Sequence, residues 1–275
     1  MNELLDTLKA SYPALAAAAS HWRYQPEPGL LTGRNILVTG AGAGIGAAAA
    51  KSFACYGANV ILLGRSRKPL EEVFDWIETH TDTQAVIVPC DLELLDASAT
   101  HALHSAISET YGVLHGLLHN ASRLGPKVPL AHYPIEEWLR VIQTNVNAPF
   151  ILTHTLFDLL DAADDACVIN TSSSVGRQGR AYWGAYAVSK FATEGFSQVL
   201  ADETESAGRI RVYSVNPGGT RTAMRKAAYP LEDPASLPSP EQHMDLYLYL
   251  MAGSRSGKTL PATGAQLDAR TWECQ

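Results

Sequence analysis

Short apolar runs alternate along this chain with longer stretches in which apolar residues recur every three or four positions. A short apolar run is typical of a strand buried on both faces, and the longer period is typical of a helix packed on a sheet. The pattern predicts strands at 36–38, 59–63, 85–88, 114–118, 167–169 and 210–215. It predicts helices at 45–56, 69–80, 96–111, 134–160 and 184–206.

Strands that alternate with helices in this way form βαβ units with right-handed crossovers. We therefore predict the α/β class, as a single doubly wound Rossmann-type domain with a central parallel sheet and helices on both faces. The predicted domain spans 31–275, and residues 1–30 form an N-terminal helical extension with an Ala-rich helix over 3–20. That extension is either a segment with its own docking surface or a frayed arm.

Composition narrows the class of protein. Hydrophobic residues make up 46% and charged residues 18%, which suits a large core, and the net charge of −7 argues against a nucleic-acid binder. The cysteines lie far apart without a CxxC pair, as expected for free thiols in a reducing compartment. No apolar run of about 18 residues predicts a membrane span, and no export signal is recognisable at the N-terminus. We expect a cytoplasmic protein.

A glycine-rich turn joins the first predicted strand to the first predicted helix. It runs from Thr39 to Gly46 and contains Gly40, Gly44, Ile45 and Gly46. Glycines let the backbone approach a pyrophosphate, and the helix N-terminus supplies free N–H groups. The position of the turn predicts a dinucleotide site, whereas a plain tight turn is the simpler alternative.

The end of the second strand bears on the choice of cofactor. An NAD enzyme places an acid there to bind the ribose 2′-hydroxyl. Here Gly64 stands in that position and Arg65 follows, a residue able to grip a 2′-phosphate through paired hydrogen bonds. NADP(H) is therefore predicted over NAD(H), and a solvated basic helix start is the alternative.

Tyr186 and Lys190 are four residues apart at the start of a predicted helix, so both side chains lie on one helical face. A cation about 4 Å away is worth roughly 4 kcal/mol at an effective dielectric of 20, and one pKa unit is about 1.36 kcal/mol. Lys190, helped by an oxidised nicotinamide, is expected to bring the pKa of Tyr186 near neutrality and make it a general acid or base. Ser173 follows the strand at 167–169.

Together these motifs resemble the short-chain dehydrogenase/reductase family over about residues 33–265. The segments at 173–180 and 216–224 look like a bacterial branch of oxidoreductases similar to oxoacyl-carrier reductases. The resemblance implies four catalytic residues, in which Ser173 orients the substrate, Tyr186 exchanges its proton, Lys190 supports Tyr186, and Asn145 holds a water in the proton relay.

The same resemblance implies further cofactor contacts. Asp91 and Leu92 follow the third strand near the adenine, and Asn120 and Ala121 follow the fourth. Pro217, Gly218 and Thr222 belong to a loop whose threonine holds the nicotinamide carboxamide. Two features depart from the family pattern: His119 and Ser122 flank the fourth-strand turn, and the C-terminal strand reads Leu260 to Gly264.

The activity implied is hydride transfer between nicotinamide and a carbonyl or alcohol, in a homodimer or homotetramer that pairs the helices at 134–160 and 184–206. An NADP(H)-binding sensor without turnover is the alternative. An enzyme of the extended, epimerising relatives fits less well, because little chain follows residue 250. Pairs of histidines occur without an acidic or cysteine partner set, so we predict no metal.

Several basic residues fall in loops expected at the mouth of the site, namely Arg177, Arg180, Arg221, Arg225 and Lys226. They indicate either an anionic or carrier-bound substrate, or simply solvated loop charge. Trp183 and Tyr182 form a pocket wall or pack the start of the helix. The proline-rich segment at 229–240 is either a substrate cover or an irregular linker.

Overall fold

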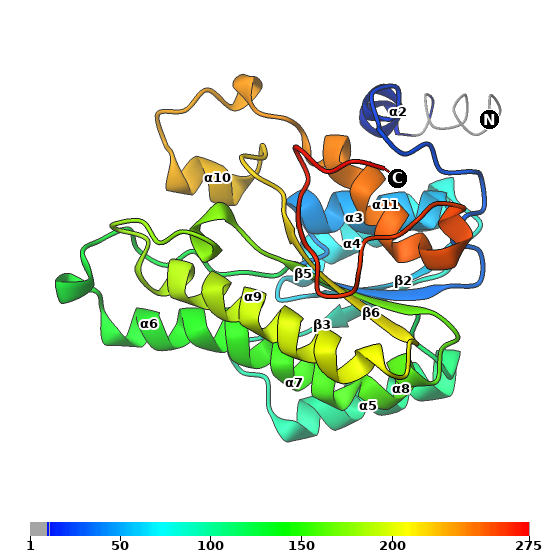
Figure 1. The fold of residues 1–275 in the computed structure, drawn as a ribbon, viewed down its shortest axis with the longest axis horizontal. Helices are drawn as coiled ribbons and strands as arrows, with labels where there is room; N and C mark the ends of the chain where they lie inside the picture. Colours follow the sequence, from blue (N-terminus) through cyan, green and yellow to red (C-terminus); the bar gives the residue numbers. More distant parts are fainter. Residues whose placement is uncertain (1–9, 11, 275) are drawn as a thin grey trace.

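The computed structural model of the protein describes residues 10 and 12–274 (Figure 1). Its centre is a sheet of seven strands in which every neighbouring pair is parallel, in the order β3-β2-β1-β4-β5-β6-β7. The strands are β1 Asn35–Thr39, β2 Asn59–Gly64, β3 Ala85–Pro89, β4 Gly116–His119, β5 Ala166–Thr171, β6 Ile210–Asn216 and β7 Gln266–Asp268. The doubly wound parallel architecture predicted from the alternation of elements is confirmed.

Helices cover both faces of this sheet (Figure 1). One face carries α3 Gly44–Cys55, α4 Arg67–His80 and α11 Met244–Ala252. The other carries α5 Ala97–Tyr111, α6 Ile135–Ile142, α7 Ala148–Thr155, α8 Phe157–Asp161 and α9 Gly184–Glu205. Alternate strand residues enter the two cores: Ile36 and Val38 pack on the first face and Leu37 on the second. Burial on both faces explains why the strands read as continuous apolar runs.

The winding reverses beside β1, which lies between β2 and β4. The crossovers that leave β1 and β4 therefore pass on opposite faces of the sheet, and the carboxyl ends of these strands open into a crevice. The loop that follows β6 leads into α10 Ala223–Ala228, which lies beyond this edge (Figure 1).

Two predicted elements differ from the structure, and one helix was not predicted. The predicted helix 134–160 is interrupted by a π-helical turn, Gln143–Asn147, and by a break at Leu156. Pro149 has no N–H, so the carbonyl of Asn145 lacks the usual partner four residues on. The predicted C-terminal strand at 260–264 is wrong: the chain turns at 262–265, and the strand is β7. Finally, α11 was not predicted, because all its residues are buried and it shows no amphipathic period.

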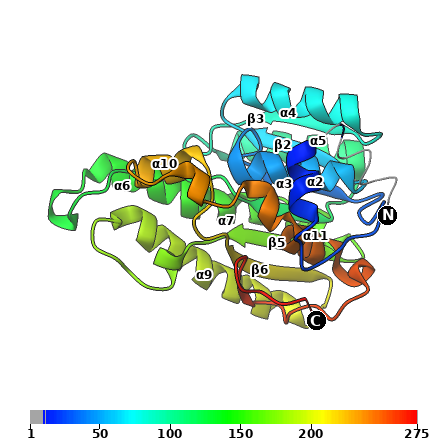
Figure 2. The same ribbon diagram turned by 90° about the horizontal axis from the view of Figure 1, so that it is seen from above.

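The N-terminal segment packs on the face that carries α3 and α11 (Figure 1, Figure 2). Its helix is α2 Pro13–Ala19, and the predicted residues 3–9 and 11 lie outside the described part. Leu15, Trp22 and Tyr24 are buried. The described helices include none that is both long and apolar enough to cross a bilayer.

A cluster of three charged residues, Arg34, Asp165 and Arg211, fixes the amino ends of β1, β5 and β6. Arg34, 1% exposed, donates to the Asp165 carbonyl at 2.6 Å and to its carboxylate at 3.2 Å. Arg211 donates to the other carboxylate oxygen at 2.7 Å. Burial alone would raise the pKa of Asp165, but the two guanidinium groups hold it below its ordinary value. Asp165 thus joins β1, β5 and β6.

We expect Asp165→Asn to lower the free energy of unfolding by about 3 kcal/mol, because two buried guanidinium groups lose their counter-charge. Since folding lowers the pKa of Asp165, its contribution is present above the unfolded value of about 3.9 and is lost as the pH falls below it. Urea unfolding at several pH values measures this, with the exposed neighbour Asp164→Asn as control. Equal stability of wild type and Asp165→Asn at pH 7 would contradict the expectation.

Candidate active site

The glycine-rich turn brings the start of α3 against the end of β1. Gly40 and Gly44 have positive φ angles of 68° and 55°, which favour glycine. Any side chain at Gly46 would collide with the Gly40 carbonyl, so the helix can approach this closely only with glycine there. Ala43, the N-cap of α3, makes no side-chain capping bond. The first N–H groups of α3 therefore remain available for an anion such as a pyrophosphate.

Thr39 ties this turn to the end of β4. Its hydroxyl accepts hydrogen bonds from the backbone amides of Asn120 and Ala121, both at 3.0 Å. The Asn120 side chain also donates to the Thr39 carbonyl at 3.3 Å. His119, which precedes them, points away from the turn and bonds the Thr153 hydroxyl of α7 at 2.9 Å.

A cavity of about 400 Å³ adjoins the turn on the side of β2 and β3. Arg65, Asp91 and Leu92 line it, as predicted for the adenosine end of a cofactor, together with Gly40 and Ala121. The Arg65 side chain is exposed at its edge. The Asp91 carboxylate accepts the Glu93 amide at 3.0 Å, which fixes the loop after β3.

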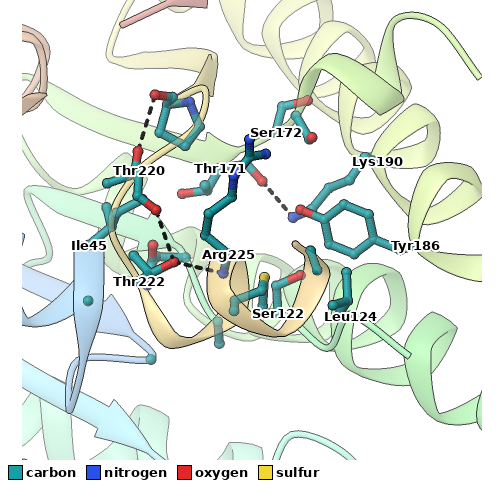
Figure 3. Close-up of a pocket in the computed structure, with 18 of the residues that line it drawn as sticks. Ile45, Ser122, Leu124, Thr171, Ser172, Tyr186, Lys190, Thr220, Thr222 and Arg225 are labelled. Atoms are coloured by element: carbon teal, nitrogen blue, oxygen red, sulfur yellow. Dashed lines mark hydrogen bonds between the residues drawn. The ribbon is translucent and has the colours of Figure 1, made fainter. Parts of the chain in front are cut away.

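A second cavity, about 320 Å³ in volume, continues from the first over the ends of β1, β4, β5 and β6 (Figure 3). Gly40 and Ala121 line both cavities, so the two form one cleft. Its wall brings together most of the predicted site residues, namely Gly44, Ile45, Asn120, Ser173, Tyr186, Lys190, Pro217, Gly218 and Thr222. The Thr222 hydroxyl accepts the Arg225 amide at 3.1 Å and so caps α10.

Ser173, Tyr186 and Lys190 meet at the inner end of this cavity. Ser173 follows β5, and its hydroxyl acts to lower the pKa of the Tyr186 phenol. The Lys190 ammonium lies 5.5 Å from the centre of the Tyr186 ring and donates to the Thr171 carbonyl at 2.7 Å (Figure 3). Tyr186 and Lys190 are both buried on α9.

The pKa values of Tyr186 and Lys190 differ from the expected ones. Burial raises the pKa of Tyr186 to about 12, and the effect of the Ser173 side chain offsets only part of this rise. Burial also lowers the pKa of Lys190 to about 8, although the carboxylate of Glu194 acts in the opposite direction. The Lys190 ammonium points at the Thr171 carbonyl. The loss of hydration therefore raises the pKa of Tyr186 by more than the nearby cation lowers it. These residues alone therefore do not bring Tyr186 near neutrality.

Asn145 lies behind Lys190, in the π-helical turn. Its side-chain oxygen accepts the Arg123 amide at 2.7 Å, and its amide donates to the Arg123 carbonyl and to the Ser189 hydroxyl. It does not line the main cleft. A separate cavity of about 270 Å³ joins it to Lys190, and its lining includes the polar side chains of Asn170 and Thr193, which could hold a water.

Comparison with known proteins agrees with this geometry. The family model described as short chain dehydrogenase matches residues 34–233. The chain belongs to the short chain dehydrogenase family. It is 50% identical over 236 residues to the uncharacterized oxidoreductase YciK of Escherichia coli (strain K12), a match covering 86% of this chain and 93% of that one.

Two solved structures of short chain dehydrogenases are similar throughout. One, from Shigella flexneri 2a in complex with NADP, is 48% identical with a TM-score of 0.84, over 89% of this chain and all of that one. The other, from Escherichia coli CFT073 in complex with NADPH, is 48% identical with a TM-score of 0.83, over 90% of this chain and all of that one.

In this short chain dehydrogenase two of the five basic residues of the mouth are paired with carboxylates within the protein, and the other three are exposed. Of the five that the sequence singles out, Arg225 alone lines the cleft, and Glu232 binds it through two contacts of 2.6 Å. Arg177 donates to Glu194 at 2.9 Å. Arg180 and Arg221 are exposed. Within the described residues, no group of three His, Cys, Asp or Glu side chains could hold a metal.

Sequence reasoning missed Glu194, which follows Lys190 by one helical turn. One of its oxygens accepts Ser172 at 2.5 Å and Arg177 at 2.9 Å, and the other accepts Ser214 at 2.5 Å. The carboxylate is 5% exposed. It thereby joins α9 to β5, to β6 and to the loop after Ser173. The sequence offers no local signal for it, since its partners lie 17 to 22 residues away.

We expect Glu194→Gln to lower the pKa of Lys190 below about 8, because the carboxylate is the charge that opposes the effect of burial. The ammonium would then lose its proton at lower pH than in the wild type. NMR titration of lysine labelled at Cε measures this directly. Glu203→Gln, on the exposed face of the same helix, is the control. An unchanged Lys190 titration in a fully folded Glu194→Gln protein would refute the assignment.

Proposed function

We propose that this protein is an NADP(H)-dependent oxidoreductase that transfers a hydride between nicotinamide and a carbonyl or alcohol carbon. One observation carries the proposal: Ser173, Tyr186 and Lys190 line the same cleft as the glycine turn and Thr222. The proposed proton donor and the proposed dinucleotide site therefore share one cleft. The cofactor supplies the hydride.

The protein's own groups handle the oxygen of the substrate. In the reducing direction the Tyr186 phenol gives its proton to the developing alkoxide, and Ser173 donates a hydrogen bond to the same oxygen. Lys190 stabilises the phenolate that remains. Asn145 and Lys190 share the cavity behind the cleft, so water there can return the proton to Tyr186.

NADP(H) as the cofactor is supported by the donors present. The uncapped start of α3 suits a pyrophosphate, and Arg65 stands at the edge of the adenosine cavity with Gly64 in place of an acid. The two similar structures that contain NADP and NADPH agree with this choice.

We further infer a homodimer or homotetramer. The packed helices α6 and α9 leave large apolar side chains exposed, namely Ile135, Leu139, Val188, Phe191 and Val199. Such a patch marks a protein interface. A second copy of this chain is the partner proposed, through the helices expected from the sequence.

We expect Arg65→Ala to weaken NADPH binding about tenfold and to leave NADH binding unchanged, because only NADPH carries the 2′-phosphate. Titration of intrinsic tryptophan fluorescence with each nucleotide gives the two dissociation constants. Arg67→Ala is the matched control, since Arg67 is already paired with Glu71. Equal weakening of both nucleotides by Arg65→Ala would remove the phosphate contact from the proposal.

We expect Tyr186→Phe to reduce turnover at least about a hundredfold while NADPH binding persists, because the ring stays and only the acidic proton is lost. Consumption of NADPH with a panel of ketones, aldehydes, quinones and acyl thioesters tests wild type and variant together. A wild type that binds NADPH but reduces none of these compounds would favour the sensor alternative. Full activity in Tyr186→Phe would rule out the phenol as proton donor.

A further inference from the structure

The outer part of the cleft has apolar walls. Leu124, Trp183, Met224 and Ala228 line it on the side away from the glycine turn, and Ser122 and Ser173 are polar (Figure 3 shows Leu124 and Ser122). Leu124, Trp183 and Met224 also pack against the small core around Tyr186. The surface next to the proton donor is thus apolar.

Trp183 is the largest of these side chains, and its surroundings hold it in place. Its ring centre lies 5.7 Å from that of Tyr186 and 5.9 Å from that of Tyr229. The Lys127 ammonium sits 4.7 Å from the Trp183 ring and 4.5 Å from the Tyr229 ring. It also donates to the Ala228 carbonyl at 2.8 Å. Cation–π contact and ring packing fix the indole before a substrate arrives, which favours binding of another flat or cyclic apolar group.

The cations that line the cleft already have partners within the protein. Among the described residues that line the cleft, Lys190 and Arg225 are the only ones with a positive side chain. Lys190 faces Thr171 and Tyr186, as described above. Arg225 is held in a two-pronged contact by Glu232, and its guanidinium carbon lies 3.9 Å from the Tyr229 ring. A carboxylate that enters would lose its hydration, and neither of the two cations that line the cleft is free to pair with it.

The size of the cleft limits the substrate further. Its 320 Å³ must take the nicotinamide end of a cofactor as well as the reacting compound, since the residues predicted to hold both line one space. The room that remains favours a small compound.

We propose that the substrate is an uncharged carbonyl compound or alcohol with an apolar ring seated against Trp183, and that Trp183 is a specificity-determining residue. The inference rests on the proposed oxidoreductase function. It replaces the anionic or carrier-bound substrate that the basic loops suggested, because the one loop cation that lines the cleft is neutralised within the protein.

The test uses pairs of carbonyl compounds that differ only in a carboxylate. The pairs are cyclohexanone with 4-oxocyclohexanecarboxylate and benzaldehyde with 4-carboxybenzaldehyde, each followed by NADPH consumption. We expect kcat/KM to be at least about tenfold higher for the neutral member of each pair. Glu232→Gln frees the charge of Arg225, so it should raise kcat/KM for the carboxylates and leave the neutral compounds unchanged.

Trp183→Leu should raise KM for the ring compounds about tenfold with a smaller change in kcat, whereas the exposed neighbour Tyr182→Leu should change neither. Preference for the carboxylates, or an unchanged KM in Trp183→Leu, would overturn this inference and leave the oxidoreductase proposal standing. NADPH binding without consumption for every compound would instead overturn the proposed function, and the inference with it.

Discussion

The cleft depends on one constraint, the close junction of the glycine turn with the end of β4. At this point β1 has strands on both sides and the crossovers diverge, so the sheet edge opens. Thr39, at the end of β1, holds the segment after β4 at a fixed distance through its hydrogen bonds to Asn120 and Ala121. A hydroxyl that accepts two backbone amides leaves neither of them buried without a partner. The start of α3 and the strand that leads to Ser122 are thereby held together.

A second feature is that buried charge is neutralised within the protein. Asp165 pairs with two arginines at the amino ends of the strands, and Glu194 accepts hydrogen bonds from Arg177 and two serines near the carboxyl ends. A buried carboxylate is tolerated only when hydrogen bonds and counter-charges replace water. Glu194 also lies one helical turn from Lys190. The same carboxylate that secures the loop after β5 therefore offsets part of the fall that burial causes in the pKa of the Lys190 ammonium.

The sequence was sufficient for features that depend on local pattern. Strands buried on both faces have to be apolar runs, and a phosphate turn has to be rich in glycine, so β1 and the Gly40–Gly46 turn were predictable. Tertiary contacts decided the rest. The π-helical turn depends on Pro149 and on the bonds between Asn145 and Arg123, which no periodicity reveals. Leu260 to Gly264 looked like a strand, but a turn at Gly264, with φ of 81°, delays pairing until β7.

The N-terminal segment shows why composition alone could not assign it a role. The Trp22 indole donates to the Glu241 carbonyl at 3.0 Å, and the Tyr12 hydroxyl donates to the Glu241 carboxylate at 2.9 Å. Two residues later, His243 bonds the Thr220 hydroxyl at 3.0 Å, on the loop that carries Thr222. Arg23 also donates to the carbonyls of Ala269 and Arg270, just beyond β7. The segment before β1 therefore anchors, through Glu241 and His243, the far end of the same loop that lines the cleft.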